Sequence, residues 1–135
     1  MKKIFLLIST TIILLASFSC RTKKDPHVPP DVVFKTGGNY TSADKTVGVG
    51  DTILVGVTVT KTEDDLKSYN ISYAYDGAAT TTTFYNYLMT SAQFNSYDKD
   101  TSFVVRPIPG SEKWTFTILD RDGNITQKSI TLTVN

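Results

Sequence analysis

Apolar and polar residues alternate with a period of two along most of the last hundred positions of this sequence. The clearest run covers 52–60, where Ile53, Val55, Val57 and Val59 take every second position and threonines hold most of the others. Such alternation places one set of side chains on each face of a β-strand, whereas an amphipathic helix needs a period of 3.6. The 21 threonines of the chain, mostly beside Val, Ile, Phe and Tyr, are also typical of strands. The pattern predicts an all-β fold.

Seven segments carry this alternation, and turn-forming Gly, Asp and Pro residues separate them. It is complete in 53–59, 69–75, 103–105, 114–118 and 130–134, and partial in 32–34 and 80–87. No amphipathic helix longer than a turn or two is expected, although Thr90–Gln93 fits a capping box and predicts one turn before Asn95. Strands at near-regular spacing without long helices predict one antiparallel β-sandwich of about seven strands.

Residues 1–19 have the layout of a secretory signal peptide. Lys2 and Lys3 precede an apolar stretch from Ile4 to Phe18, and small residues follow near its end. A membrane-spanning helix needs about 20 apolar residues, and this stretch has 15. We therefore expect residues 1–19 to be cleaved from the mature chain.

The end of this leader, Leu15–Cys20, resembles the lipobox of bacterial lipoproteins, and the small residues Ser17 and Ser19 resemble sites used in Bacteroidota. In that family the Cys is acylated and becomes the first mature residue. The resemblance implies lipidation of Cys20, the only cysteine of the chain, by fatty acyl chains such as palmitate. Arg21 stands where many inner-membrane lipoproteins have Asp, which implies the outer membrane, with the domain facing the periplasm or the cell surface.

Residues 20–30 are expected to form the lipidated Cys and a flexible tether. The segment after Cys20 contains three basic residues, three prolines and the only histidine, His27, without apolar periodicity. We expect a solvated, extended spacer with a solvated His27. The remaining 31–135 is long enough for one sandwich.

The last third of the chain resembles a known family of domains. Gly110–Gly123, a glycine leading into an aromatic-alternating strand that ends in Asp-x-x-Gly, is similar to the penultimate strand of polycystic-kidney-disease (PKD) type domains. Val49–Ile53 is similar to the entry to their second strand. The resemblance implies an immunoglobulin-like, PKD-like or fibronectin-III-like sandwich, as in small Bacteroidota lipoproteins and the N-terminal modules of their starch-binding outer-membrane lipoproteins. Antibody-type domains join their sheets with two cysteines, so we expect Trp114 to fill this core by itself.

Composition argues against several functions. The formal net charge is +1, from 14 Lys+Arg and 13 Asp+Glu, so no basic surface indicates nucleic-acid binding. A single His and a single Cys cannot assemble a His-pair metal site or an internal disulfide. The one His lies in the expected tether, away from any serine or threonine nucleophile. We therefore expect no enzyme activity and no cofactor.

Aromatic residues supply the candidate ligand-binding site. Within 69–75 the three tyrosines share a face with an isoleucine, so we expect them between the two sheets. In the stretch Phe84, Tyr85, Asn86, Tyr87, alternation turns either the two tyrosines or Phe84 outward. Exposed Tyr85 and Tyr87, with Asn86 between them, would suit the binding of sugar rings.

Two further motifs have a structural and a functional interpretation. Asp120, Asp122 and Asn124 offer three oxygen side chains in five positions, as in half of a calcium loop, but Asp, Gly and Asn also form tight hairpin turns. The turn is the favoured interpretation because a calcium loop needs more oxygen ligands. Asp51-Thr52-Ile53 resembles the O-glycosylation sequon of Bacteroidota exported proteins, although Thr52 also fits an ordinary outward strand position.

These features predict a non-enzymatic, lipid-anchored lipoprotein of the bacterial cell envelope that serves as a binding or interaction module. The alternative is a glycan-binding accessory lipoprotein of a polysaccharide-uptake system, acting through Tyr85, Asn86 and Tyr87. A third possibility is a purely structural envelope spacer. The expected partners are the membrane, through Cys20, and envelope proteins or polysaccharide.

Overall fold

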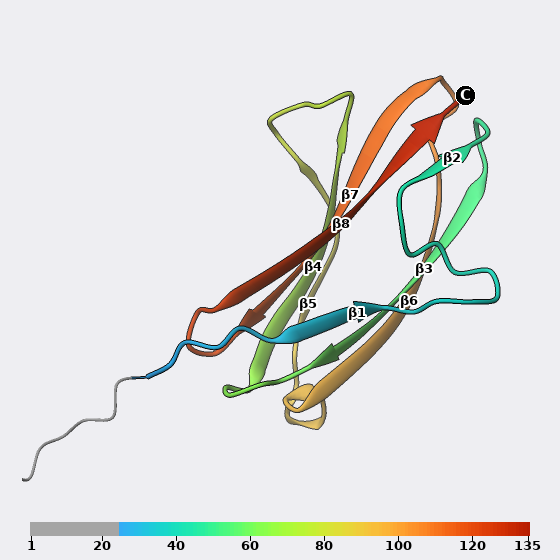
Figure 1. The fold of residues 1–135 in the computed structure, drawn as a ribbon. Coiled ribbons are helices and arrows are strands. Elements are labelled where there is room, and N and C mark those ends of the chain that lie inside the picture. The colour runs from blue at the N-terminus through green and yellow to red at the C-terminus, as the bar shows by residue number, and fades with distance from the viewer. Residues whose placement is uncertain (1–24) are drawn as a thin grey trace, which may run out of the picture.

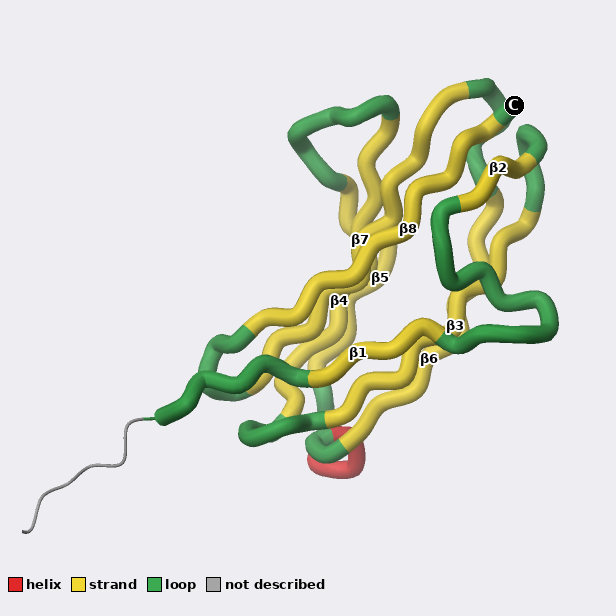
Figure 2. Tube along the Cα trace, viewed as in Figure 1, coloured by secondary structure: helices red, strands yellow, loops and turns green. Residues whose placement is uncertain are grey.

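A computed structural model describes residues 25–135, which form two β-sheets packed face to face (Figure 1). One sheet has the strand order β1-β3-β6, and the other has the order β2-β8-β7-β4-β5. Neighbouring strands are antiparallel except β2 and β8, which are parallel. A single-turn 3-10 helix, η1 (Ser91–Gln93), joins β5 to β6 (Figure 2). The strands are β1 (Asp31–Phe34), β2 (Lys45–Val47), β3 (Thr52–Thr60), β4 (Leu66–Tyr75), β5 (Thr82–Leu88), β6 (Ser96–Val104), β7 (Gly110–Asp120) and β8 (Ile125–Val134).

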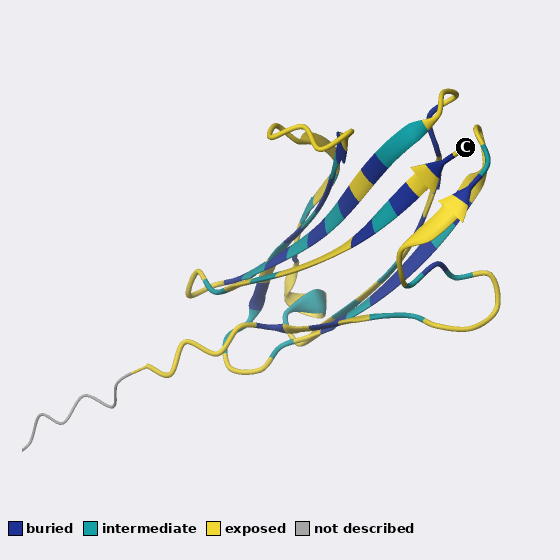
Figure 3. Cartoon of the chain, turned by 45° about the horizontal axis from the view of Figure 1, so that its top comes forward, coloured by how far each residue is buried: buried dark blue, intermediate teal, exposed yellow. Residues whose placement is uncertain are grey.

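The alternating residues of the sequence form the core between the sheets. Ile53, Val55, Val57 and Val59 of β3 are at most 3% exposed, and every second residue of β7 is buried opposite them (Figure 3). Burying one such aliphatic side chain contributes about 1.5–3 kcal/mol relative to leaving it in water. This burial fixes the register of the strands, because a slip by one residue would turn the whole set toward solvent.

The arrangement is an immunoglobulin-like β-sandwich, as the sequence predicted. All seven expected segments form strands, and the predicted helical turn is present as η1, where the Thr90 backbone N–H donates to the Gln93 side chain at 3.0 Å. The sequence did not predict β2, a three-residue strand beside the end of β8. In a constant-type immunoglobulin domain four strands face three. Here β5 pairs with β4 and the additional strand β2 pairs with β8, so that three strands face five.

Trp114 on β7 lies in the interior between the two sheets. It is 3% exposed, and the Phe103 ring from the opposite sheet stacks on it with a centroid distance of 3.6 Å. The rings of Tyr73 and Phe84 pack at 5.0 and 5.2 Å. Contacts between aromatic rings thus join the two sheets, and Trp114 fills the core together with these rings and not by itself as expected.

The two ends of the sandwich carry different loops. The N-terminal segment reaches the domain beside the β3–β4 and β7–β8 turns, whereas the β4–β5 loop and the C-terminus lie at the opposite end (Figure 1). Within 25–135, the only helix is the three-residue η1, so none has the length or hydropathy that crossing a membrane requires.

Candidate functional site

The candidate site is the edge formed by β5, one of four strands with a neighbour on one side only. Unpaired edges attract other strands, and proteins usually protect them by shortness, charge or proline. The edge strand β1 has four residues and follows two prolines, β2 has three residues, and β6 carries three charged residues at 98–100. The seven residues of β5 include neither a charged residue nor a proline. Among the described edges longer than four residues, β5 is therefore the one that its composition leaves unprotected.

The register shows which backbone groups of β5 remain unpaired. Met89 donates its backbone N–H to the Lys67 carbonyl, so the backbone polar groups of Met89 point toward β4. Those of Tyr87 and Tyr85, two and four residues earlier in the chain, point the same way. Hydrogen-bonding direction alternates along an antiparallel strand. The N–H and C=O groups of Asn86 and Leu88 therefore point away from the sheet, toward any strand that approaches this edge.

A β-bulge changes which aromatic residues of β5 face the core. Ile71 is opposite Tyr85 and Ser72 is opposite Thr83, so Phe84 is the extra residue of the bulge. Phe84 packs against Phe103 and Trp114 inside the sandwich but stays 44% exposed, and Tyr85 on the same side is half-buried. The expectation that Phe84 and the tyrosines occupy opposite faces was therefore wrong, because the bulge interrupts the alternation.

Tyr85 and Tyr87 form a half-buried stack with Tyr97 of β6. Tyr87 lies nearly parallel to both other rings, at centroid distances of 6.3 Å from Tyr85 and 5.4 Å from Tyr97. The hydroxyls of Tyr85 and Tyr97 are 3.4 Å apart, and burial raises the pKa of Tyr97. Asn86 is exposed on the opposite face of the strand and its side chain accepts a hydrogen bond from Asn70 at 3.4 Å. The structure thus brings the two tyrosines together, with Asn86 on the other face.

Lys99 lies beside this stack, between the edges of the two sheets. Its ammonium is 4.9 Å from the centroid of the Tyr85 ring, a cation-π distance. Lys99 follows Tyr97 by two residues on β6 and therefore shares its inward face, and it is partly buried. Within residues 25–135 no carboxylate lies within 4.0 Å of its ammonium. Sequence reasoning missed Lys99, because the alternation of β6 was recognised only at 103–105.

An ion pair positions the beginning of the β4–β5 connection. Arg106 donates from both terminal nitrogens to the Asp76 carboxylate, at 2.6 Å each, and its guanidinium packs on the Tyr75 ring. These bonds lower the pKa of Asp76 from its ordinary value of 3.8 to about 2. Asp76 and Gly77 both have positive φ, and Ala78 N–H donates to the Tyr75 carbonyl, which closes a tight turn. Tyr75 itself is 39% exposed, so it lies at the rim and not in the core as predicted.

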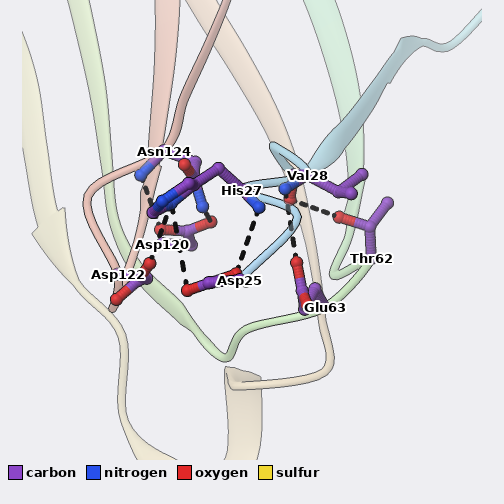
Figure 4. A network of polar contacts seen from close by, with 8 residues as sticks. All are labelled: Asp25, His27, Val28, Thr62, Glu63, Asp120, Asp122 and Asn124. Carbon is purple, nitrogen blue, oxygen red and sulfur yellow. Dashed lines mark hydrogen bonds and ion pairs between the residues drawn. The ribbon is translucent and has the colours of Figure 1, made fainter. Parts of the chain in front are cut away.

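The N-terminal segment is bound to the domain from His27 onward (Figure 4). Thr62 donates its hydroxyl to the carbonyls of Val28 and Pro29, at 2.9 and 2.8 Å, and Thr126 donates to the carbonyl of Pro30 at 2.6 Å. Val28 and Pro29 of the expected solvated spacer are exposed, but these bonds hold 28–30 against the domain, and Pro30 is buried. The threonines that bind this segment lie 33 to 96 residues away in the sequence, so no local sequence pattern predicts these hydrogen bonds.

His27 is part of an exposed polar cluster at this end, not an isolated solvated ring. Its Nδ1 lies 3.2 Å from the Asp122 carboxylate and 3.9 Å from that of Asp25 (Figure 4). The Asp25 carboxylate raises the pKa of Asp122. Ligand atoms of these three residues lie within 4.8 Å of one another, and Asp25 forms a second such group with Glu63 and Asp64. These are the described groups whose side chains could hold a cation.

The remaining predicted residues are placed as follows. Asp120 is fully buried and accepts hydrogen bonds from the backbone N–H and side-chain amide of Asn124, at 2.8 and 2.9 Å, while Asp122 turns toward His27. This geometry closes the β7–β8 hairpin, as the turn interpretation predicts. Thr52 is exposed at the start of β3. Residues 1–24, with the leader and Cys20, lie outside the described part of the chain.

Comparison with known proteins gives similarity at the level of the fold. No protein-family model matches the sequence, and no curated protein matches it either. The solved structure of Spo0M, a sporulation control protein from Bacillus subtilis, is 9% identical over 80% of this chain and 50% of its own, with a TM-score of 0.50. A family 123 glycoside hydrolase from Clostridium perfringens is 7% identical over 78% of this chain and 27% of its own, with a TM-score of 0.48. Murine CRIg is 11% identical over 80% and 99%, with a TM-score of 0.42.

The chain thus spans half of the first of these structures and about a quarter of the second. Identities this low carry information about the fold alone.

Proposed function

We propose that this chain is a non-enzymatic, lipid-anchored binding module of the bacterial cell envelope, and that its binding surface is the β5 edge. The observation that carries the proposal is an edge strand without charge or proline that exposes 69% of Leu88 and 44% of Phe84. Edge strands on a packed scaffold are common sites of partner binding by strand addition. Proteins otherwise protect such edges.

The N-terminal sequence supports the anchoring part of the proposal. The leader and the lipobox-like residues before Cys20 predict acylation, and two or more acyl chains hold a protein on a membrane stably. The seven peptide steps from Cys20 to His27 span at most about 25 Å when fully extended. Because the chain is bound to the domain from His27 onward, a membrane anchor at Cys20 would hold the domain close to the lipid surface, on the outer membrane by resemblance.

The surroundings of the only histidine support a non-enzymatic role. His27 is exposed and contacts two carboxylates, and within residues 25–135 no serine or threonine hydroxyl is hydrogen-bonded to it. A hydroxyl nucleophile needs a base within hydrogen-bond reach. The geometry therefore favours binding over catalysis.

Anchoring is tested with Cys20→Ser in cells labelled with radioactive palmitate. We expect the unaltered chain to carry label and sediment with membranes, and Cys20→Ser to carry none and to stay in the soluble fraction. Unlabelled Cys20 in the unaltered chain, shown by mass spectrometry, would overturn the anchoring.

Binding at β5 is tested by photo-crosslinking in the same cells. A photoreactive amino acid at position 88 should give a discrete adduct. The matched control is position 104 on the charged edge β6, where Val104 is 64% exposed. Equal adducts at both positions, or none at 88, would contradict a binding site at β5.

The glycan-binding alternative remains a separate outcome. Sugar rings stack on free aromatic faces, whereas the faces of Tyr85, Tyr87 and Tyr97 lie largely against one another. This arrangement favours strand binding over sugar stacking. Retardation by a polysaccharide in affinity electrophoresis, lost in Tyr87→Ala, would instead support the glycan-binding function.

A further inference from the structure

We propose that β5 binds an extended, acidic segment of another protein, which adds to the five-stranded sheet as a sixth strand and places a carboxylate against Lys99. The inference deepens the proposed binding function, on which it rests, by naming the chemistry of the partner.

The backbone of β5 provides the first half of this recognition. Asn86 and Leu88 direct their N–H and C=O groups outward, and an antiparallel partner residue opposite each of them exchanges two hydrogen bonds. Thr90 ends the available edge, because its N–H and C=O are bonded to Gln93. The bulge at Phe84 interrupts the edge on the other side. The accessible stretch therefore accommodates a short strand centred on residues 86–88.

Lys99 provides the second half. Its neighbours Asp98 and Asp100 face the other side of β6, where they accept hydrogen bonds from Thr58 and from Lys35 and Tyr40, respectively. The Lys99 ammonium therefore has the Tyr85 ring as its described partner and no carboxylate within 4.0 Å among residues 25–135. A partly buried cation without a counter-ion favours an anionic ligand group.

The sheet geometry brings these two halves together. In a strand added to β5, the residues opposite Tyr85 and Tyr87 direct their side chains inward, on the same side as those two rings. Lys99 approaches the Tyr85 ring from β6 on that inward side. An Asp or Glu opposite Tyr85 would thus lie beside the ammonium, whereas a Lys there would meet a like charge.

The position of the anchor argues against a second copy of this chain as the partner. Two β5 edges that pair antiparallel run in opposite directions, so their tether ends point away from each other. Both chains would have to reach one membrane from Cys20 positions within about 25 Å of their bound segments. The same pairing also brings the two Lys99 side chains to one side of the joined sheet, where like charges repel.

The test uses the full chain purified in detergent and two synthetic nine-residue peptides. The peptides alternate Val and Thr and carry either one Glu or one Lys two residues after the centre, which is the position opposite Tyr85 when an antiparallel peptide is centred on Tyr87. Fluorescence anisotropy should show binding of the Glu peptide about tenfold tighter than the Lys peptide, the factor that corresponds to about 1.4 kcal/mol. Lys99→Gln should bring this ratio close to one while both peptides still bind.

Proline substitution separates strand addition from other modes of binding. Asn86→Pro removes an outward N–H that β4 does not use, so we expect the fold to remain and peptide binding to be lost. The matched control is Ser102→Pro, because Ser102 likewise points its N–H outward on the β6 edge. It should leave peptide affinity unchanged. If Asn86→Pro does not fold, Leu88→Pro, which removes the other outward N–H, replaces it.

Three results would overturn the inference. They are equal affinity for the Glu and Lys peptides, equal effects of Asn86→Pro and Ser102→Pro, and a stable dimer in analytical ultracentrifugation that Asn86→Pro dissociates. Peptide binding does not depend on acylation, so a failure of the Cys20→Ser experiment would refute the anchor without refuting strand addition.

Discussion

The buried carboxylate of Glu112 gives a sharp test of how this core is held together. Glu112 is fully buried on β7, where one oxygen accepts the Arg106 backbone N–H at 2.6 Å and the other accepts the Trp114 indole N–H at 2.9 Å. Glu112→Gln keeps the shape but replaces one acceptor with an NH₂ group. One of the two buried donors must then face another donor.

A buried donor without a partner costs about 1–3 kcal/mol. For a domain of this size each kcal/mol lowers the melting temperature by about 5 °C, so we expect Glu112→Gln to lower it by roughly 5–15 °C. The chain has one Trp, so its indole N–H gives a single NMR signal, which should move upfield when the hydrogen bond weakens. Glu63→Gln serves as the control, because Glu63 accepts only a 3.3 Å bond from Val28 and Gln can still accept it.

A double-mutant cycle decides whether the indole bond is the cause. Trp114→Phe removes that donor, so the Glu112→Gln change should cost less by about 1 kcal/mol in the Phe background. An unchanged cost in both backgrounds, or a Glu112→Gln chain more stable than the original, would refute the reasoning. The second result would mean that burying the charge costs more than the two hydrogen bonds contribute.

Three further predictions concern the loops that position β5 and the N-terminal segment. The pKa of Asp76 is depressed to about 2, so its contribution to stability is present above pH 3.8 and is lost as pH falls toward 2; Asp76→Asn should flatten this part of the acid-unfolding curve. Gly110 has φ of +145° and no room for a Cβ beside the Arg106 guanidinium, so Gly110→Ala should lower the melting temperature more than the control Gly123→Ala, whose Cβ meets open space. Thr126→Val removes the hydroxyl that binds the Pro30 carbonyl, so hydrogen exchange should rise at the Val28 amide while the melting temperature changes little.

The sequence was sufficient to predict most of the fold, because a strand that buries one face needs apolar and polar residues at alternating positions. The exceptions have local physical reasons. β2 is too short for a period to be visible, and its stability comes from pairing with the end of β8. β6 begins at Ser96, but polar and charged residues fill its first half, where the inward side chains are Tyr97 and Lys99.

The candidate site was only partly predictable. Tyr85 and Tyr87 were found from composition, but their mutual stacking and the inward turn of Phe84 depend on a bulge that no single residue signals. Lys99 reaches Tyr85 from the other sheet, and Thr126 binds Pro30 across 96 positions. Such contacts arise from the packing of the sheets, so a linear pattern does not contain them.

The contacts that hold the two ends of β5 affect how strongly its edge can bind a partner strand. The Asp76–Arg106 pair holds the turn before the β4–β5 loop, and the Met89–Lys67 backbone bond with the Thr90–Gln93 turn holds the end of the strand. Binding costs free energy when a surface must be ordered first. An edge that is already held in extended form avoids most of this cost. The main remaining cost in free energy is then the ordering of the incoming segment. It follows that Arg106→Gln, which frees the β4–β5 connection, should weaken peptide binding at β5 although Arg106 lies at the far end of the sandwich from Asn86 and Leu88.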